Sequence, residues 1–355
     1  MEIEIIIGTY DCFIKGYSFD LISTDQNIRS KFYEKSHTGC LKAVACNGRY
    51  LASGSTDETI KLYDLQDHTE VGTLVQHEGT ITELVFFGGT HLVSASEDQT
   101  ICIWECGNNW DCLHVLKGHK GRINSVSIHP SGKLALSVAK DKTLRMWNLL
   151  TGRMSYVNNL KQVAELVVWN PVGDQYVVAY DTTLSVCDVQ SGSVTQNISI
   201  GKHINAVQYI KEKILAIASE LPYIQLYSVV TGKCLYKLEG HTNRVKTLIM
   251  APGNSFLFSA SSDGTIRAWK MDENLSLCSC VCHVDTKSRP TCMTLSNLAV
   301  KMEPPSTTVQ PTEESKQLTK AAKSDTKSRK RKTEQKSCTE TEDTTKELHK
   351  KTRQH

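Results

Sequence analysis

Residues 118–147 read GHKGRINSVSIHPSGKLALSVAKDKTLRMW and contain His119, Ser137, Asp141 and Trp147. Histidine, serine and aspartate are the residue types of a hydrolase triad, in which the histidine is the base for the serine nucleophile. A hydrolase needs one such set in one cleft, whereas hydrogen bonds that brace a fold can occur in many places. The two interpretations therefore differ in whether the set recurs along the chain.

The same set occurs in four copies, and in each copy the serine lies four residues before the aspartate and the aromatic residue six after it. The copies are His37, Ser53, Asp57 and Tyr63; His77, Ser94, Asp98 and Trp104; His119, Ser137, Asp141 and Trp147; and His241, Ser259, Asp263 and Trp269. No copy differs from the others as the single site of an enzyme would, so the sequence predicts no catalytic residue. A structural role is favoured instead, because polar groups buried between strands commonly brace a fold by finding partners.

Weaker copies extend the repeat along the chain. Asp181 and Leu221 take the aspartate position in two of them, and the copy at Leu221 is preceded by His203. The N-terminus adds a copy with Asp11 at this position, so that neighbouring positions are 40–46 residues apart. A repeat of about 40–45 residues that begins near a Gly-His pair is typical of a four-stranded β-propeller blade. Seven such positions predict seven blades.

The residues between these positions favour strands. Each repeat contains short runs rich in Val, Ile and Leu, such as LKAVAC at 41–46 and TICIWEC at 100–106, and turn residues separate the runs. No long segment before residue 300 has the apolar period of a helix. The fold class expected from the sequence is therefore all-β.

The N-terminal copy begins too late in its repeat to supply a whole blade. Ile3–Tyr10, Cys12–Phe19 and Lys31–Lys35 can form three of its strands, and Thr291–Val300 is expected to form the fourth, innermost strand. Leu275–Val284 is expected to be the last strand of the preceding blade. Such a closure joins the two ends of the domain and leaves no open sheet edge.

This repeat resembles that of the WD-repeat family over about residues 1–300, most specifically in the four full copies. The pairs Tyr63-Asp64 and Trp104-Glu105 are similar to the Trp-Asp pair after which the family is named. The resemblance implies a seven-bladed β-propeller closed by N- and C-terminal strands, with an internal His, Ser, Asp and Trp hydrogen-bond chain in each full blade. It also implies a binding protein that is not an enzyme and has no cofactor.

Two longer stretches, INSVSIHPSGKLALSVAKDKTLRMWNL at 123–149 and SASSDGTIRAWK at 259–270, are similar to one branch of that family. This resemblance implies a nucleolar factor for assembly of the large (60S) ribosomal subunit and pre-rRNA processing. It also implies a negative regulator that binds the regulatory region of a p21-activated kinase. The implied partners are this kinase, pre-60S assembly factors and, through a basic tail, pre-rRNA. A purely cytoplasmic scaffold that inhibits a kinase and has no ribosomal role is the alternative.

The candidate partner contacts lie beside the repeated aspartates, where the residue type varies between repeats, and in the loops that enter first strands. They are Thr56, Glu97, Lys140, Tyr180, Ser262, Arg122 and Arg244. All are expected on one face of the ring, where they would bind a macromolecule and not a small-molecule substrate. The alternative for each residue is simple exposure to solvent.

Residues 301–355 differ in composition from the rest of the chain. They contain 14 Lys and Arg against 9 Asp and Glu, a balance of +5, while the whole chain has a net charge of +3. With few apolar residues they are expected to form a disordered tail. A basic cluster within it predicts nuclear import, although an ordinary solvated charge run is the alternative. The cluster consists of Lys327, Arg329, Lys330, Arg331 and Lys332.

Other chemistry is disfavoured. Cys278, Cys280 and Cys282 precede His283, but alternation along a strand would put the three thiols on one face, packed against the next blade, and no second ligand pair accompanies them. No metal site is therefore expected. Thirteen cysteines without framework spacing, and the lack of a signal-peptide or membrane-span pattern, favour a reducing compartment, the cytosol or nucleus, and no membrane partner is expected. The family resemblance implies the nucleus and nucleolus.

Overall fold

The computed structural model describes residues 2–23, 26–107, 109–272 and 278–296. The chain divides into two units, residues 1–301 and 302–355, and the second unit lies outside the described residues. The expected disordered tail and its basic cluster at 327–332 therefore lie outside them too. The described residues form 28 strands and no helix. Accordingly, none of them belongs to a helix that could cross a membrane.

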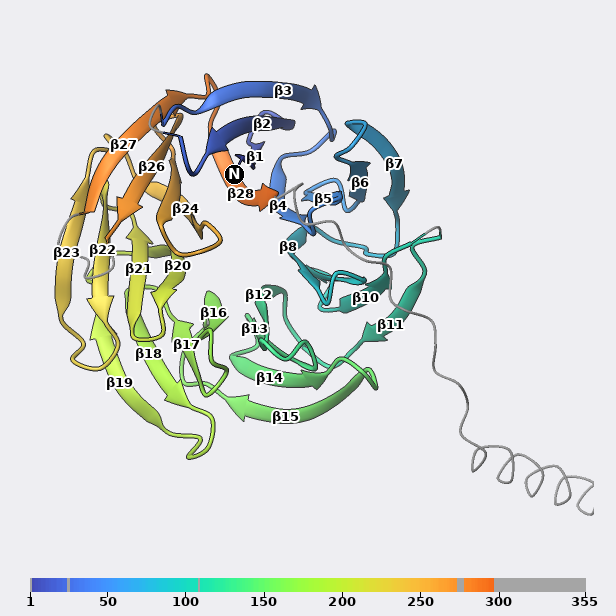
Figure 1. Cartoon of the computed structure of the whole chain (residues 1–355). Coiled ribbons are helices and arrows are strands. Elements are labelled where there is room, and N and C mark those ends of the chain that lie inside the picture. Colours follow the sequence, from blue (N-terminus) through green and yellow to red (C-terminus); the bar gives the residue numbers. More distant parts are fainter. Residues whose placement is uncertain (1, 24–25, 108, 273–277, 297–355) are drawn as a thin grey trace, which may run out of the picture. The chain divides into compact units, whose positions relative to one another are not determined.

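The strands form seven four-stranded antiparallel sheets, arranged as blades around a central axis (Figure 1). Blade 1 comprises β4 (Leu41–Cys46), β5 (Tyr50–Ser55), β6 (Ile60–Asp64) and β7 (Thr69–Leu74). Blade 2 comprises β8 (Ile81–Phe87), β9 (His91–Ser96), β10 (Ile101–Glu105) and β11 (Cys112–Leu116). Blade 3 comprises β12 (Ile123–Ile128), β13 (Leu134–Ala139), β14 (Thr143–Asn148) and β15 (Arg153–Asn159). Blade 4 comprises β16 (Leu166–Trp169), β17 (Gln175–Ala179), β18 (Thr183–Asp188) and β19 (Val194–Ser199).

The remaining blades follow the same order. Blade 5 comprises β20 (Ile204–Lys211), β21 (Ile214–Ser219), β22 (Tyr223–Ser228) and β23 (Cys234–Glu239). Blade 6 comprises β24 (Val245–Met250), β25 (Phe256–Ser261), β26 (Thr265–Met271) and β27 (Cys278–Asp285). Blade 7 comprises β28 (Pro290–Ser296), β1 (Glu2–Thr9), β2 (Phe13–Asp20) and β3 (Arg29–Lys35). The seven-bladed, all-β fold expected from the sequence is thereby confirmed.

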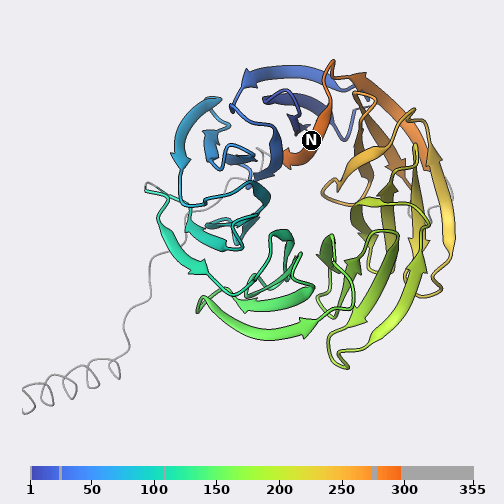
Figure 2. The same ribbon diagram turned by 180° about the vertical axis from the view of Figure 1, so that it is seen from behind.

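Blade 7 closes the ring with strands from both ends of the described chain. Its order is β28-β1-β2-β3, and β28 pairs with β1 so that Ile6 lies opposite Thr294 (Figures 1 and 2). The predicted closure is correct, with the fourth strand at Pro290–Ser296. The remainder of the expected strand, 297–300, and the start of the expected last strand of blade 6, 275–277, lie outside the described residues.

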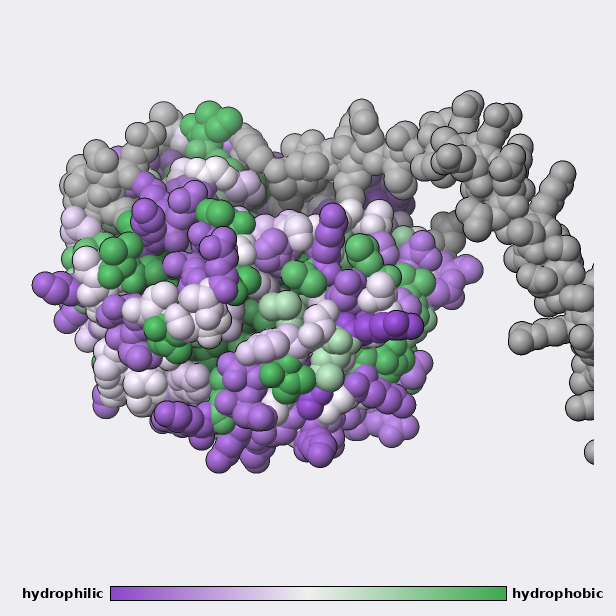
Figure 3. Space-filling model, turned by 90° about the horizontal axis from the view of Figure 1, so that it is seen from below, coloured by the Kyte–Doolittle hydropathy of each residue, from purple (hydrophilic) through white to green (hydrophobic). Residues whose placement is uncertain are grey.

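The hydrophobic core lies between neighbouring blades. Second strands such as β25 are buried along their whole length, because both of their faces are covered by sheets. Cluster members come from two adjacent blades, as where Leu62 of blade 1 packs with Ile81 and Leu84 of blade 2. The outermost strands are exposed, and polar and apolar side chains alternate over the rim (Figure 3).

Side-chain hydrogen bonds also join neighbouring blades near the axis. Asn124 Nδ2 donates to the carbonyl of Ala164 over 2.8 Å, and Asn205 Nδ2 donates to that of Val245 over 3.0 Å. Each bond joins residues 40 positions apart in the sequence. Residues that lie one repeat apart in the sequence therefore contact each other in neighbouring blades.

A β-bulge occurs in the outermost strand of every blade, opposite the aromatic position of the repeat in the third strand. Pairing with the outermost strand shifts immediately before Tyr17, Tyr63, Trp104, Trp147, Cys187, Tyr227 and Trp269. A bulge adds one unpaired residue to one strand and increases the local twist. The two degenerate repeats and the N-terminal one share this geometry with the four full copies.

Candidate partner-binding face and channel mouth

Blade 3 brings together the four residues with which the sequence analysis began. His119 Nε2 lies 2.7 Å from Ser137 Oγ, and His119 Nδ1 lies 3.0 Å from Asp141 Oδ2. Trp147 Nε1 donates to the same serine oxygen over 2.8 Å. Asp141 also accepts a hydrogen bond from the backbone N–H of Lys120 over 2.8 Å, which fixes the loop before β12. One polar chain therefore connects the third strand to the loop that enters the blade.

Blades 2 and 6 repeat this arrangement, whereas blade 1 differs in its aromatic residue. The distance from imidazole Nε2 to the serine Oγ is 2.8 Å in the pairs His77–Ser94, His241–Ser259 and His37–Ser53. The other ring nitrogen of each histidine contacts a carboxylate, that of Asp98, Asp263 or Asp57. In blades 2 and 6 the indole N–H groups of Trp104 and Trp269 donate to the serines. In blade 1 the hydroxyl of Tyr63 lies 2.5 Å from Ser36 Oγ, which lies 3.4 Å from Ser53 Oγ. Ser36 replaces the direct contact because the phenol oxygen projects further than an indole nitrogen.

Burial determines the charge of these groups. It lowers the pKa of His119 and His241, and the hydrogen bonds and charges of their aspartates offset this only in part. Burial alone would raise the pKa of Asp57 and Asp263, but hydrogen bonds from neighbouring threonines and backbone amides lower it to about 2. Neutral imidazoles thus face ionised carboxylates. Because Ser137 is 0% exposed, no substrate can reach its hydroxyl.

His203 takes a different position from the other repeat histidines. It lies directly before β20, and its Nδ1 contacts Asp181 Oδ1 of blade 4 over 2.8 Å, so it pairs across a blade boundary. His203 does precede the copy at Leu221, and its carbonyl accepts a hydrogen bond from the backbone N–H of Glu220 in that blade, but its imidazole forms no network within the blade. The histidines of the full copies lie four residues before the first strand, and this extra distance lets them turn back into their own blade.

The turns beside the repeated aspartates and the loops entering first strands lie on one face of the ring. Backbone N–H groups of these turns donate to carbonyls of these loops at 2.9–3.0 Å, in the pairs Thr56–Cys40, Glu97–Thr80, Lys140–Arg122 and Ser262–Arg244. Six of the seven candidate contacts are therefore neighbours on this face, which we call the aspartate face. Tyr180 is the exception, since its ring packs partly against the core between blades 3 and 4.

Charged pairs cross between blades on the aspartate face. Arg122 Nη1 lies 3.4 Å from Glu97 Oε1 of blade 2, and Arg244 Nη1 lies 3.7 Å from Glu220 Oε1 of blade 5. All four side chains are partly exposed, so the pairs contribute little to stability. These pairs instead hold charged groups at fixed positions on the aspartate face.

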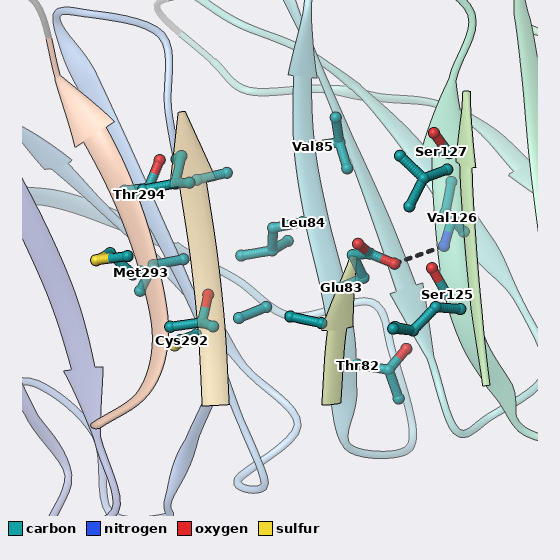
Figure 4. Close-up of a pocket in the computed structure, with 18 of the residues that line it drawn as sticks. Thr82, Glu83, Leu84, Val85, Ser125, Val126, Ser127, Cys292, Met293 and Thr294 are labelled. Atoms are coloured by element: carbon teal, nitrogen blue, oxygen red, sulfur yellow. Dashed lines mark hydrogen bonds between the residues drawn. The ribbon is translucent and has the colours of Figure 1, made fainter. Parts of the chain in front are cut away.

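A channel of about 630 Å³ runs along the axis, lined by all seven innermost strands. Glu83 of β8 points across the gap to β12, where its Oε2 accepts a hydrogen bond from the backbone N–H of Val126 over 2.6 Å (Figure 4). Burial raises the pKa of this carboxyl to about 7, against the effect of the hydrogen bonds it accepts. Glu83 thus joins two blades within the channel wall.

β-bulges direct one residue of most first strands into the mouth of this channel. Pairing with the second strand skips Lys42, Thr82, Asn124, Asn205 and Lys246, and Thr291 is skipped in the pairing of β28 with β1. A bulge changes the direction of a side chain. Accordingly, all six line the channel, and two of them are lysines.

Sequence reasoning missed three cations near this mouth, Lys42, Lys246 and Arg289. Arg289 directly precedes β28 as Arg122 precedes β12 and Arg244 precedes β24, so the rule that selected those arginines would have found it. Lys42 and Lys246 carry no comparable signal, because a bulge is not visible in the residue types around them.

The cysteines of β27 do not share a face as expected. Cys278 packs against the core between blades 5 and 6, whereas Cys282 packs against the core between blades 6 and 7. The bulge opposite Trp269 falls between Cys280 and Cys282 and reverses the alternation. Within the described residues no group of His, Cys, Asp and Glu is arranged to hold a metal ion.

The model of the WD domain, G-beta repeat, matches residues 29–64, 68–105, 110–148 and 232–270, which contain the four full copies. A Gallus gallus protein named "p21-activated protein kinase-interacting protein 1-like" is 40% identical over 294 residues, 82% of this chain and 79% of that protein. The chain belongs to the WD-repeat family of p21-activated protein kinase-interacting protein 1.

Two fungal proteins are more distant relatives. "Protein MAK11" of Saccharomyces cerevisiae is 28% identical over 84% of this chain and 84% of its own length. "Shk1 kinase-binding protein 15" of Schizosaccharomyces pombe is 28% identical over 77% of this chain and 79% of its own length. Kinase binding is thus named in relatives from animals and from a yeast, and these names describe binding and no catalysed reaction.

Proposed function

We propose that this protein is a non-enzymatic scaffold of the nucleolus that supports assembly of the 60S ribosomal subunit and pre-rRNA processing. We further propose that it restrains a p21-activated kinase by binding the regulatory region of the kinase. The kinase role rests on one observation above the others, that animal relatives covering 82% of the chain are named for interaction with such a kinase. A rigid ring with loops gathered on one face suits a binding role.

The proposed contact surface is the aspartate face. Thr56, Glu97 and Lys140 are exposed there, and Arg122 and Arg244 present guanidinium groups beside them. Arginine is enriched at the energetic centres of interfaces, because its planar group forms several directed hydrogen bonds. Ser262 and Tyr180 are more enclosed, so we assign them a smaller part in the contact.

The ribosomal role is supported by the resemblance of the blade sequences to the nucleolar branch of the family, and by the basic cluster at 327–332. We propose that this cluster directs nuclear import, and that the tail adds affinity for pre-rRNA through phosphate contacts. The basic residues of the cluster are Lys327, Arg329, Lys330, Arg331 and Lys332.

We propose that this protein is not an enzyme, and the hydrogen-bond networks of the repeats support this. Their serines are 0% exposed and are hydrogen-bonded to tryptophan or histidine on the inside of each blade. A nucleophile requires a cleft that admits the substrate. We therefore assign these residues to the fold.

Affinity capture of the full chain from cells, followed by mass spectrometry, tests the two roles together. We expect large-subunit precursors and a p21-activated kinase among the captured proteins, and we expect Arg122→Ala with Arg244→Ala to deplete at least one of them. Kinase without ribosomal precursors would favour the cytoplasmic alternative. Alanine at all five basic residues of the cluster should move the chain to the cytosol, and unchanged nuclear localisation would refute the import role.

A further inference from the structure

Four cations gather on one side of the channel mouth. Lys42 and Lys246 project from the bulges of β4 and β24, while Arg244 and Arg289 lie in the loops before β24 and β28. The three blades that supply them are consecutive in the ring, since β28 packs between β24 and β4 (Figure 1). We call these four residues the cationic mouth.

Acidic partners are scarce at the cationic mouth. Among the described residues Glu220, 3.7 Å from Arg244, is the carboxylate within ion-pairing distance of this group, and none there lies within that distance of Lys42, Lys246 or Arg289. Burial lowers the pKa of Lys246, and repulsion from Arg244, Arg289 and Lys42 lowers it further. The charges therefore oppose one another, and an anion placed among them would relieve the repulsion.

Unpaired hydroxyl groups accompany these cations. Ser262 Oγ and Thr82 Oγ1 are buried and have no hydrogen-bond partner. Ser262 lines a hollow of about 410 Å³ together with Arg244, Arg289, Asn243 and Glu220. Buried hydroxyl groups normally have partners, so the unpaired donor of Ser262 can turn toward this hollow and donate to an oxygen ligand held by the two guanidinium groups.

The opposite side of the mouth carries both charges. Glu97 and Glu165 line the adjoining hollow of about 320 Å³ together with Lys42, Lys246 and Arg122, and Glu97 is already paired with Arg122. An anionic ligand is thus attracted to blades 6, 7 and 1, whereas blades 2 and 4 add negative charge through Glu97 and Glu165. This asymmetry would fix the direction in which an elongated ligand enters.

We propose that the cationic mouth binds an acidic segment of a protein partner, with a carboxylate held by Arg244, Arg289 and Ser262 and another directed toward Lys246 and Lys42. The residues lining both hollows include no aromatic side chain on which a nucleic-acid base could stack, and the exposed ring of Tyr10 nearby already lies against the guanidinium group of Arg289 at 5.8 Å, which favours a peptide over single-stranded RNA. This proposal depends on the proposed function in one respect only, namely that a partner protein binds at the aspartate face.

Fluorescence anisotropy of the full chain with a short labelled peptide rich in Glu and Asp tests this proposal. The decisive variant is Lys42→Met with Lys246→Met, because methionine keeps the apolar stem of each lysine and removes its charge. Lys133→Met with Lys213→Met is the matched control, since both are exposed lysines in turns between first and second strands, on the opposite face. We expect binding to weaken at least about tenfold in the first variant and less than about twofold in the control.

Arg289→Gln gives an independent measurement, because Arg289 is exposed and its replacement leaves the channel wall intact. We expect it to weaken binding about fivefold or more. Equal losses in both lysine pairs, or no binding by the unaltered chain, would overturn the proposal. Tighter binding of a single-stranded RNA of equal charge, weakened by the same substitutions, would reassign the mouth to RNA. Peptide binding by a chain that captures no kinase would instead count against the proposed function.

Discussion

The indole N–H of Trp147 donates to the hydroxyl of Ser137 over 2.8 Å inside blade 3. The neighbouring Trp169, in blade 4, is equally enclosed, but its Nε1 has no hydrogen-bond partner. Two buried tryptophans of one chain therefore differ in a single hydrogen bond. The repeat pattern distinguishes them, because Trp147 follows a repeat aspartate by six residues and Trp169 does not.

Replacement of each tryptophan by phenylalanine measures this bond. Trp147→Phe removes both ring volume and the hydrogen bond, whereas Trp169→Phe removes ring volume and an unpaired donor. We expect Trp147→Phe to lower the free energy of unfolding by about 1 kcal/mol more than Trp169→Phe does. Urea unfolding of both variants provides the comparison, and equal losses would show that the bond contributes nothing net.

Asp141→Ala is expected to destabilise the fold by about 1–3 kcal/mol, because it leaves His119 and the backbone N–H of Lys120 without their acceptor. Asp181→Ala is the control, since the carboxylate of Asp181 is 74% exposed although it also contacts a histidine. We expect this control to stay within about 0.5 kcal/mol of the unaltered chain. A similar loss in both would contradict a bracing role for the repeat aspartate.

Stability should decrease on acidification in two steps. The pKa values of His37, His119 and His241 are lowered in the folded chain by burial, so the unfolded chain takes up protons first as pH falls through about 6.5. Asp57 and Asp263 have folded pKa values of about 2 against 3.8 ordinarily, so their contribution is present above about pH 4 and is lost as pH approaches 2. Unfolding measured from pH 8 to pH 3 should show both decreases, and stability that rises below pH 6 would contradict these protonation states.

Gly8 lies where both ends of the domain meet blade 1. A Cβ atom there would lie 2.6 Å from Cys292 Sγ and 3.0 Å from Leu41 Cβ. Gly8→Ala should therefore destabilise the closure by about 1–3 kcal/mol through overpacking. Gly72→Ala is the control, because nothing lies within 4 Å of a Cβ atom at this position of β7. An unfolding temperature that is unchanged in Gly8→Ala would mean that β1 and β28 move apart at little energetic cost.

The blade count, the closure and the four residues that form the network in blades 2, 3 and 6 could be predicted from the sequence. They depend on spacing, and a blade can bury Trp147 beside Ser137 only when strand and turn lengths are kept. The path of the network in blade 1 could not be predicted, because Ser36 joins it only through the extra reach of Tyr63. The pairing of His203 with Asp181 could not be predicted for a related reason, since the two residues belong to different blades.

The sequence by itself determined the repeat, because a 40-residue unit with alternating apolar residues can bury its surface only against copies of itself. Tertiary structure decided which residues meet around the axis. Lys42 and Lys246 are some 200 positions apart, and their proximity results from two bulges and from the closure that places β28 between their blades. Bulges depend on how paired strands twist, and closure joins the two ends of the domain, so neither is visible in the residues near each lysine.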